Sequence, residues 1–118
     1  MTQTVDLIYK IVPASLWREA QENGCFTGAP ADLADGFIHF SAADQLRETA
    51  AKWFSGQADL LLVAVDPVTL GDALRFEPSR GGALFPHLYS TLLLDAVVFA
   101  KPLPLRPDGQ HDFTGLLF

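Results

Sequence analysis

The segment Asp59-Leu60-Leu61-Leu62-Val63-Ala64-Val65 places six apolar residues in an unbroken row. A short run of this kind, bounded by polar residues, is typical of a strand that is buried on both faces. Asp66-Pro67 follows the run and predicts a short helical turn that ends near Gly71. A fully buried strand and a capped turn are therefore expected over residues 59–71.

The segment just before this strand predicts a helix over residues 42–54, which Gly56 ends. Ser41 is its expected N-cap, and Asp44, three residues later, completes a pattern like a capping box. The apolar face has helical spacing and consists of Leu46, Thr49, Ala50, Trp53 and Phe54. This is the clearest periodic pattern in the chain.

The other elements are shorter. Before residue 41 the sequence predicts a strand over 5–12, a helix from Pro13 to Gly24, a turn-rich loop over 29–35 and a short strand over 36–40. After residue 71 it predicts a strand over 74–77, an extended segment over 84–89, a strand over 95–101 and an irregular tail over 102–118. Pro86 favours an edge or a bend for the extended segment.

Two helices that come early and strands that come mostly late favour an α+β fold over a doubly wound sheet. We expect one compact domain over residues 1–118, with the two helices packed on small mixed or antiparallel sheets. A chain of 118 residues is long enough to bury a core.

The composition excludes several classes of protein. A net charge of −6 is the opposite of the clustered positive charge that nucleic-acid binding requires. The single cysteine, Cys25, cannot form an intrachain disulfide, and no histidine or cysteine spacing indicates a metal site. The longest apolar run, residues 92–100, is too short to cross a bilayer, and no secretory signal is visible at the N-terminus. We expect a soluble, cytoplasmic protein without a resident metal or cofactor.

Two short segments gather the side chains that could carry chemistry. Residues 36–41 (Gly-Phe-Ile-His-Phe-Ser) contain His39 and Ser41, and residues 77–89 contain His87 and Tyr89. Residues two apart in a strand share a face, so each pair projects to one side. If the two strands are neighbours, the four side chains line one pocket with aromatic walls, which is typical of small-ligand sites.

The second segment also contains Glu77 and the turn Arg80-Gly81-Gly82. An arginine fork beside exposed backbone N–H groups is suited to a phosphate or a carboxylate, so the turn is a candidate anion site. Each residue also has a structural interpretation. Ser41 would be only a helix cap, His39 a hydrogen-bonded strand residue, Tyr89 a core aromatic, Glu77 and Arg80 a surface ion pair, and the glycines a plain turn.

The chain resembles a bacterial family catalogued as domain of unknown function 952. The resemblance covers about residues 8–101 and rests chiefly on Phe-Ile-His-Phe-Ser at 37–41 and Phe-Pro-His-Leu-Tyr at 85–89. The family in turn is similar to the ADP-ribosyltransferase fold, which implies two small sheets around a nucleotide cleft.

That resemblance implies roles for individual residues. His39-x-Ser41 is similar to the signature that positions the ribose of NAD, and Tyr89 would stack on nicotinamide. Glu77 would stabilise the positive charge that develops on the sugar when nicotinamide leaves. Arg80 with the backbone of Gly81 and Gly82 would hold the pyrophosphate, and His87 would form part of the pocket wall.

Three functions follow as hypotheses. The first is an enzyme of the ADP-ribosyl transfer type that acts on NAD or a related nucleotide. The second is a non-catalytic domain that binds a small anion or nucleotide through Arg80 and the two histidines. The third is an interaction protein that forms a homodimer through the apolar residues of 113–118.

Overall fold

The computed structural model of this chain describes residues 7–79 and 82–116. Its largest sheet contains four antiparallel strands in the order β4-β1-β5-β9. The strand bounds are Ser41–Ala42 for β4, Ile8–Pro13 for β1, Leu60–Val65 for β5 and Val97–Leu103 for β9. β5 lies between β1 and β9, and five of its six residues are buried. The prediction of a strand buried on both faces is confirmed.

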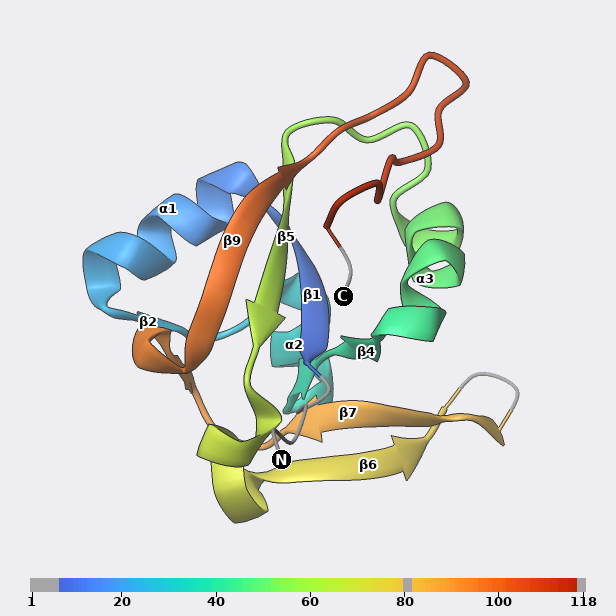
Figure 1. Ribbon diagram of the computed structural model, residues 1–118. Coiled ribbons are helices and arrows are strands. Elements are labelled where there is room, and N and C mark those ends of the chain that lie inside the picture. The colour runs from blue at the N-terminus through green and yellow to red at the C-terminus, as the bar shows by residue number, and fades with distance from the viewer. Residues whose placement is uncertain (1–6, 80–81, 117–118) are drawn as a thin grey trace, which may run out of the picture.

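A second sheet contains three antiparallel strands in the order β3-β7-β6, with bounds Ile38–His39, Leu84–Leu88 and Leu74–Pro78. The hairpin of β6 and β7 lies across the lower end of β1 and β5 (Figure 1). The expectation that Pro86 marks an edge or a bend is wrong, because β7 is the central strand. The Pro86 carbonyl points towards β3 and accepts from the N–H of Phe40, the residue just after β3 ends. In an antiparallel ladder the N–H and C=O of one residue point to the same side, so the N–H that proline lacks would also point there. Because β3 has already ended at this place, the ladder loses no hydrogen bond.

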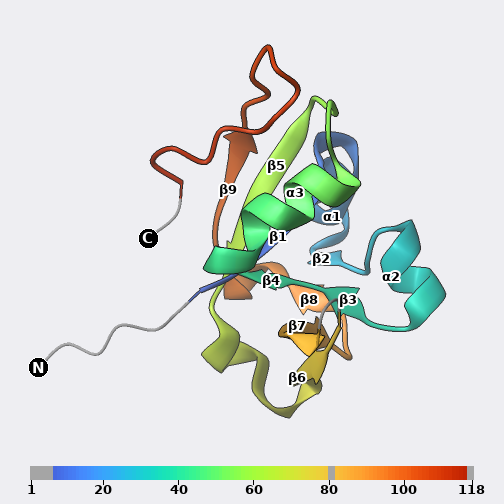
Figure 2. The same cartoon turned by 90° about the vertical axis from the view of Figure 1, so that its right-hand side faces the viewer.

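The chain passes from one sheet to the other at Phe40. His39 is the last residue of β3, whereas Ser41 begins β4 in the larger sheet and pairs with Tyr9. The prediction of Ser41 as an N-cap is therefore wrong. The side chain of Gln45 accepts from Ala42 N–H instead, and a short 3-10 helix, η1 (Ala43–Gln45), leads into the helix α3 (Leu46–Trp53). Figure 2 shows this path from β3 through β4 into α3.

The predicted loop over residues 29–35 is also wrong, since the structure has a short helix, α2 (Pro30–Asp35), at that place. The helix α1 (Ala14–Asn23) agrees with the prediction to within a residue. The remaining elements are the two-stranded sheet of β2 (Cys25–Phe26) and β8 (Leu92–Leu93) and the 3-10 helices η2 (Pro67–Ala73) and η4 (Leu94–Ala96). Asp66 caps η2 as predicted. The last strand begins at Val97, later than the predicted residue 95.

Two apolar clusters cover the two faces of the larger sheet. One packs Ile8, Val12, Val63 and Val65 against Trp17 and Ala20 of α1. The other packs Tyr9, Ile11, Leu60, Leu62 and Ala64 against Leu46 and Ala50 of α3. Phe113 of the C-terminal tail is buried in the second cluster, so this part of the tail packs on its own chain.

The α+β prediction is correct, and the chain forms one compact domain with antiparallel sheets. Within the described part of the chain, no helix has the length and apolar character needed to cross a membrane.

Candidate functional site

His39 and His87 lie directly opposite each other on neighbouring strands. In the register of the second sheet His39 of β3 pairs with His87 of β7, and the two ring centroids are 5.5 Å apart. Arg75 of β6 occupies the next place in the same row. Side chains in such a row share one face of the sheet, so the fold brings the two histidine segments together.

His87 is held by a carboxylate. Its Nδ1 lies 2.7 Å from Glu77 Oε1, and the Tyr89 hydroxyl donates to the same oxygen at 2.7 Å. Both hydrogen bonds lower the pKa of Glu77, and the one from Tyr89 has the larger effect. The hydrogen bond between Tyr89 and Glu77 also raises the pKa of Tyr89. Because a carboxylate only accepts, Nδ1 carries the proton. In the neutral ring the lone pair is then at Nε2, to which no residue of 7–79 or 82–116 is hydrogen-bonded.

His39 is held by two carboxylates. Its Nδ1 lies 2.6 Å from Asp32 Oδ1, and its Nε2 lies 2.9 Å from Asp35 Oδ2. Both aspartates belong to α2, and Gly36, in the left-handed conformation at φ 85°, turns the chain from that helix into β3. The two histidines therefore differ, because His39 faces a carboxylate at both ring nitrogens and His87 at one.

Asp32 is the buried anchor of this arrangement, with 3% of its surface exposed. It accepts from the backbone N–H groups of Ala29 and His39 and from Lys10 Nζ, which lies 3.1 Å and 3.0 Å from its two oxygens. Burial acts to raise the pKa of Asp32, but the hydrogen bond to His39 and the charge of Lys10 outweigh it and lower that pKa from 3.8 to about 2. Burial also lowers the pKa of Lys10, against the opposing effect of Asp32.

The position of Asp32 follows from local sequence. Pro30 occupies the first position of α2, and Asp32 the third. The Asp32 carboxylate accepts a hydrogen bond from the N–H of Ala29, the N-cap residue. Gly28 packs against it so closely that a Cβ there would lie 2.9 Å from Asp32 Cβ. Lys10 Nζ also donates to the His39 carbonyl at 2.9 Å, which fixes β1, α2 and β3 to one another.

An aromatic ring joins the two histidines. The centroid of Phe37 lies 4.5 Å from that of His39, 4.2 Å from that of His87 and 5.1 Å from that of Tyr89. The Arg75 guanidinium lies 5.5 Å from the Tyr89 centroid on the same face of the sheet. The imidazoles are thus packed as well as hydrogen-bonded, which limits their rotation.

A cavity of about 500 Å³ opens beside these groups. Its polar lining includes Lys10, Asp32, Asp35, His39, Ser41 and His87. Among the described residues β4 pairs only with Ile8 and Tyr9, so from Lys10 to Pro13 β1 has no strand partner there on that side. Residues from both faces of β1 line the cavity, which is consistent with this open edge facing it. Small-ligand sites commonly have such a volume and a few polar groups in an apolar wall.

The predicted site residues divide into three groups. His39, Ser41 and His87 line the cavity. Glu77 and Tyr89 do not line it and are linked to it through His87. Arg80 and Gly81 lie outside the described residues, although Ser79, directly before them, lines the cavity, and Gly82 N–H bonds the Ser79 carbonyl at 2.9 Å.

Sequence reasoning missed Lys10, Asp32 and Asp35. The signal for Asp32 was Pro30 followed two residues later by an acid, which is typical of a helix start. Lys10 gave no signal, because a lysine in a strand is usually exposed. Ser41 lies in the cavity, where its hydroxyl is 3.2 Å from that of Thr49.

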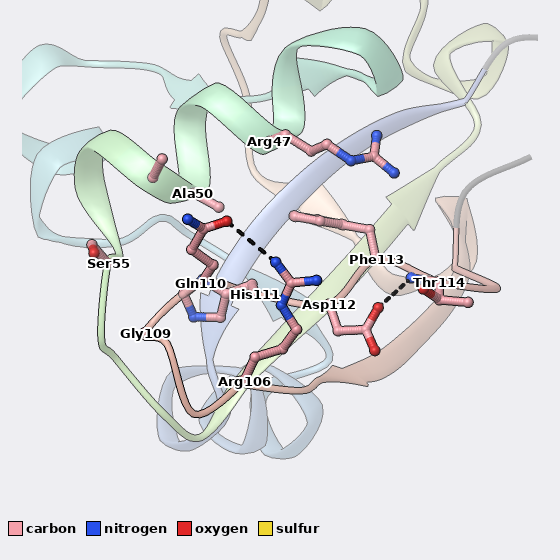
Figure 3. A pocket seen from close by; sticks show the side chains of 11 residues that line it. Arg47, Ala50, Ser55, Arg106, Gly109, Gln110, His111, Asp112, Phe113 and Thr114 are labelled. Carbon is pink, nitrogen blue, oxygen red and sulfur yellow. Dashed lines mark hydrogen bonds between the residues drawn. The ribbon is translucent and has the colours of Figure 1, made fainter.

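A second cavity, of about 270 Å³, lies between α3 and the C-terminal tail (Figure 3). Three of its polar side chains are paired within the tail or with the segment that follows α3. Arg106 donates to Gln110 Oε1 at 3.2 Å, Asp112 accepts from Thr114 N–H at 2.9 Å, and His111 Nε2 donates to the Gln57 carbonyl at 2.8 Å. The Arg47 guanidinium lies 5.5 Å from the centroid of Phe113. These contacts hold the tail against the body.

The first cavity, in contrast, combines an oriented imidazole, a buried ion pair and two hydroxyls on the junction of two sheets. Such a set can bind a polar small molecule and transfer a proton to or from it. The fold and the site therefore define a small α+β protein with a partly polar cavity at a sheet junction.

The chain belongs to the family described as "Protein of unknown function (DUF952)", whose model matches residues 11–100. It is similar to the crystal structure of protein CC0527 from Caulobacter crescentus, with 52% identity and a TM-score of 0.88 over 92% of this chain and 95% of that one. The solution NMR structure of the same protein gives 51% identity and a TM-score of 0.84 over 94% and 96%. No curated protein matches this chain.

Proposed function

We propose that this chain is an enzyme of the ADP-ribosyl transfer type, which cleaves the nicotinamide–ribose bond of NAD or a related nucleotide in the His39–His87 cavity. The observation that carries the proposal is the pairing of His39 with His87 across β3 and β7, each with a carboxylate at Nδ1. We regard the two sheets as a compact form of the ADP-ribosyltransferase fold, in a cytoplasmic protein.

The chemistry assigns a separate task to each histidine. When the glycosidic bond breaks, nicotinamide leaves as a neutral base with the bonding electron pair, and positive charge develops on the ribose. His87 Nε2 takes the proton of the attacking hydroxyl or water as its oxygen bonds to the sugar carbon. His39 holds Asp35 through its Nε2, so that the Asp35 carboxylate accepts from the ribose hydroxyls and its negative charge stabilises the charged sugar.

Glu77 acts on the reaction through His87. Its carboxylate fixes the tautomer and the orientation of the ring, as the third member of a base-and-orienter arrangement does. Tyr89, whose hydroxyl is engaged by Glu77, supports the same carboxylate. Arg80, Gly81 and Gly82 are proposed to bind the pyrophosphate at the rim, next to Ser79.

One observation favours the alternative of a domain that binds the nucleotide without cleaving it. Glu77, the acid expected to stabilise the transition state, does not line the cavity. The two functions share a binding site and differ in whether nicotinamide is released.

The test is incubation of the chain with NAD, with nicotinamide measured by chromatography, in the wild type and in His87→Asn, with His111→Asn as the matched control. We expect release by the wild type, at least roughly 100-fold less by His87→Asn because a general base contributes 10²–10⁴-fold, and no change in His111→Asn. A melting temperature that NAD raises without any nicotinamide release would establish the binding domain instead. If NAD, ADP-ribose and 2′-phosphorylated nucleotides all leave the melting curve unmoved, both proposals fail.

A further inference from the structure

The two tryptophans of this chain occupy opposite environments. Trp17 of α1 has 4% of its surface exposed and packs on Phe26, with ring centroids 6.0 Å apart. Trp53, the last residue of α3, is 64% exposed and yet lines the His39–His87 cavity. A single exposed apolar residue needs no explanation, but a large flat ring at the edge of a ligand cavity is a candidate stacking surface.

Trp53 lies away from the histidines along the cavity. The strand pairing fixes the position of Trp53 along β1. Tyr9 of β1 pairs with Ser41, which precedes α3 in the sequence, whereas Pro13 pairs with Leu60, the first residue of β5, which follows α3. Pro13 lies four residues after Tyr9, which corresponds to about 13 Å at 3.3 Å per residue. α3 runs beside β1 from the Ser41 end towards the Pro13 end, as Figure 1 shows. Trp53 therefore belongs to the end of the cavity remote from Ser41.

That remote end is apolar. Pro13, Leu16 and Phe54 line the cavity together with Trp53. The charged and hydroxyl groups of the lining come instead mainly from β3, β4, β7 and α2. The cavity thus has a polar part at the histidines and an apolar part at Trp53, so a ligand that fills it has two chemically different ends.

The open edge of β1 adds polar recognition to the apolar part. In an antiparallel ladder every second residue directs both its N–H and its C=O away from one neighbour. Between Lys10 and Val12 at least one residue therefore turns these groups away from β5, on the side where β4 has ended. A flat apolar surface beside backbone N–H and C=O groups that no described strand pairs suits a planar ring with hydrogen-bonding edges. The Lys52 ammonium, 5.7 Å from the Trp53 centroid, places a positive charge nearby.

We propose that Trp53 and the open edge of β1 form a nucleobase subsite, so that the ligand is a nucleotide whose base stacks on Trp53 while its sugar reaches His39 and His87. The inference rests on the proposed function, for which it assigns the adenine of NAD to the Trp53 end and the nicotinamide riboside to the histidine end. Trp53 is then a specificity residue for the base, and it takes no part in proton transfer.

The test is calorimetric titration of NAD and of nicotinamide mononucleotide, the half of NAD that lacks adenine. The proteins are the wild type, Trp53→Ala, Trp53→Phe and, as a control that removes an exposed apolar residue outside the cavity, Leu93→Ala. We expect Trp53→Ala to weaken NAD binding roughly 5- to 150-fold, the range for loss of base–aromatic stacking. Trp53→Phe should recover most of it, and binding of nicotinamide mononucleotide should not change in any variant.

Two results would overturn the subsite while leaving the proposed function in place. One is an unchanged NAD affinity in Trp53→Ala, and the other is an equal loss for NAD and nicotinamide mononucleotide. If the wild type binds no NAD, the proposed function fails, and the nucleobase subsite is then tested separately with adenosine. Quenching of tryptophan emission by adenosine that disappears in Trp53→Phe would support it, and the absence of such quenching would overturn it.

Discussion

The two cavities of this molecule are lined by similar residue types, but their side chains make different kinds of contact. Each has histidine, aspartate and a basic side chain in its wall. In the tail cavity the polar groups of Arg106, His111 and Asp112 bind neighbouring chain atoms (Figure 3). In the His39–His87 cavity the buried pair of Asp32 and Lys10 holds His39, and among the described residues none is hydrogen-bonded to His87 Nε2. The contacts in the tail cavity hold the tail on the body of the chain, whereas those in the other cavity hold two imidazoles beside a larger space.

The largest expected difference between the two regions concerns their aspartates. Asp32→Asn leaves the Lys10 ammonium buried without its counter-charge, which costs about 3–5 kcal/mol of unfolding free energy. Asp112→Asn, in the tail cavity, should cost far less, since that carboxylate lies in a solvated loop. Urea unfolding followed by circular dichroism measures both.

The double variant Lys10→Met with Asp32→Asn sharpens this comparison. Removing both charges avoids the unpaired ammonium, so the double variant should be more stable than Asp32→Asn alone. A double variant that is less stable than either single one would show that the ion pair is not the source of the effect.

Low pH should lower the unfolding free energy through Asp32, which lines the same cavity. The pKa of Asp32 in the folded chain is about 2, below its ordinary 3.8, so the unfolded chain binds more protons than the folded one. Asp32 therefore contributes stability that is present above pH ~4 and is lost as the pH falls towards 2, on the order of 2 kcal/mol. Unfolding free energies of the wild type should decline over this range more steeply than those of Asp32→Asn. Parallel profiles of the two proteins would contradict the prediction.

Two glycines provide a smaller contrast. Gly28 has φ 125° and no space for a Cβ against Asp32, whereas Gly109, in the tail cavity, has φ 87° and open space. In Gly109→Ala the alanine has only to adopt the left-handed conformation, which lowers the unfolding free energy by about 1–2 kcal/mol. Gly28→Ala adds a steric clash that displaces Asp32, so it should cost more. Thermal unfolding compares the two, and equal shifts in melting temperature would mean that Asp32 is not tightly packed.

Much of the fold was predictable, because the decisive signals were local. The apolar run before Asp66 predicted β5, and the strand predicted over residues 74–77 is observed as β6. Ser41 was misassigned because a serine before a helix resembles an N-cap, while its pairing with Tyr9, distant in sequence, decided its structure. Pro86 was misassigned for a similar reason, since the early end of β3 is what allows a proline in the central strand.

The site was only half predictable. The pattern of His39, His87 and Tyr89 on strand faces indicated a pocket, but adjacency of the two strands is a long-range property. Asp32 and Lys10 were missed because their importance comes from burial and from each other, over a separation of 22 residues. Local sequence contains no information about that contact.

If NAD binds at His39 and His87 and not in the tail cavity, the three histidines of the chain report on it directly. Imidazole resonances assigned by NMR through His→Asn variants can be followed while NAD is added. The signals of His39 and His87 should shift with saturation while that of His111 stays fixed. A shift confined to His111, or no shift of any histidine at millimolar NAD, would contradict it.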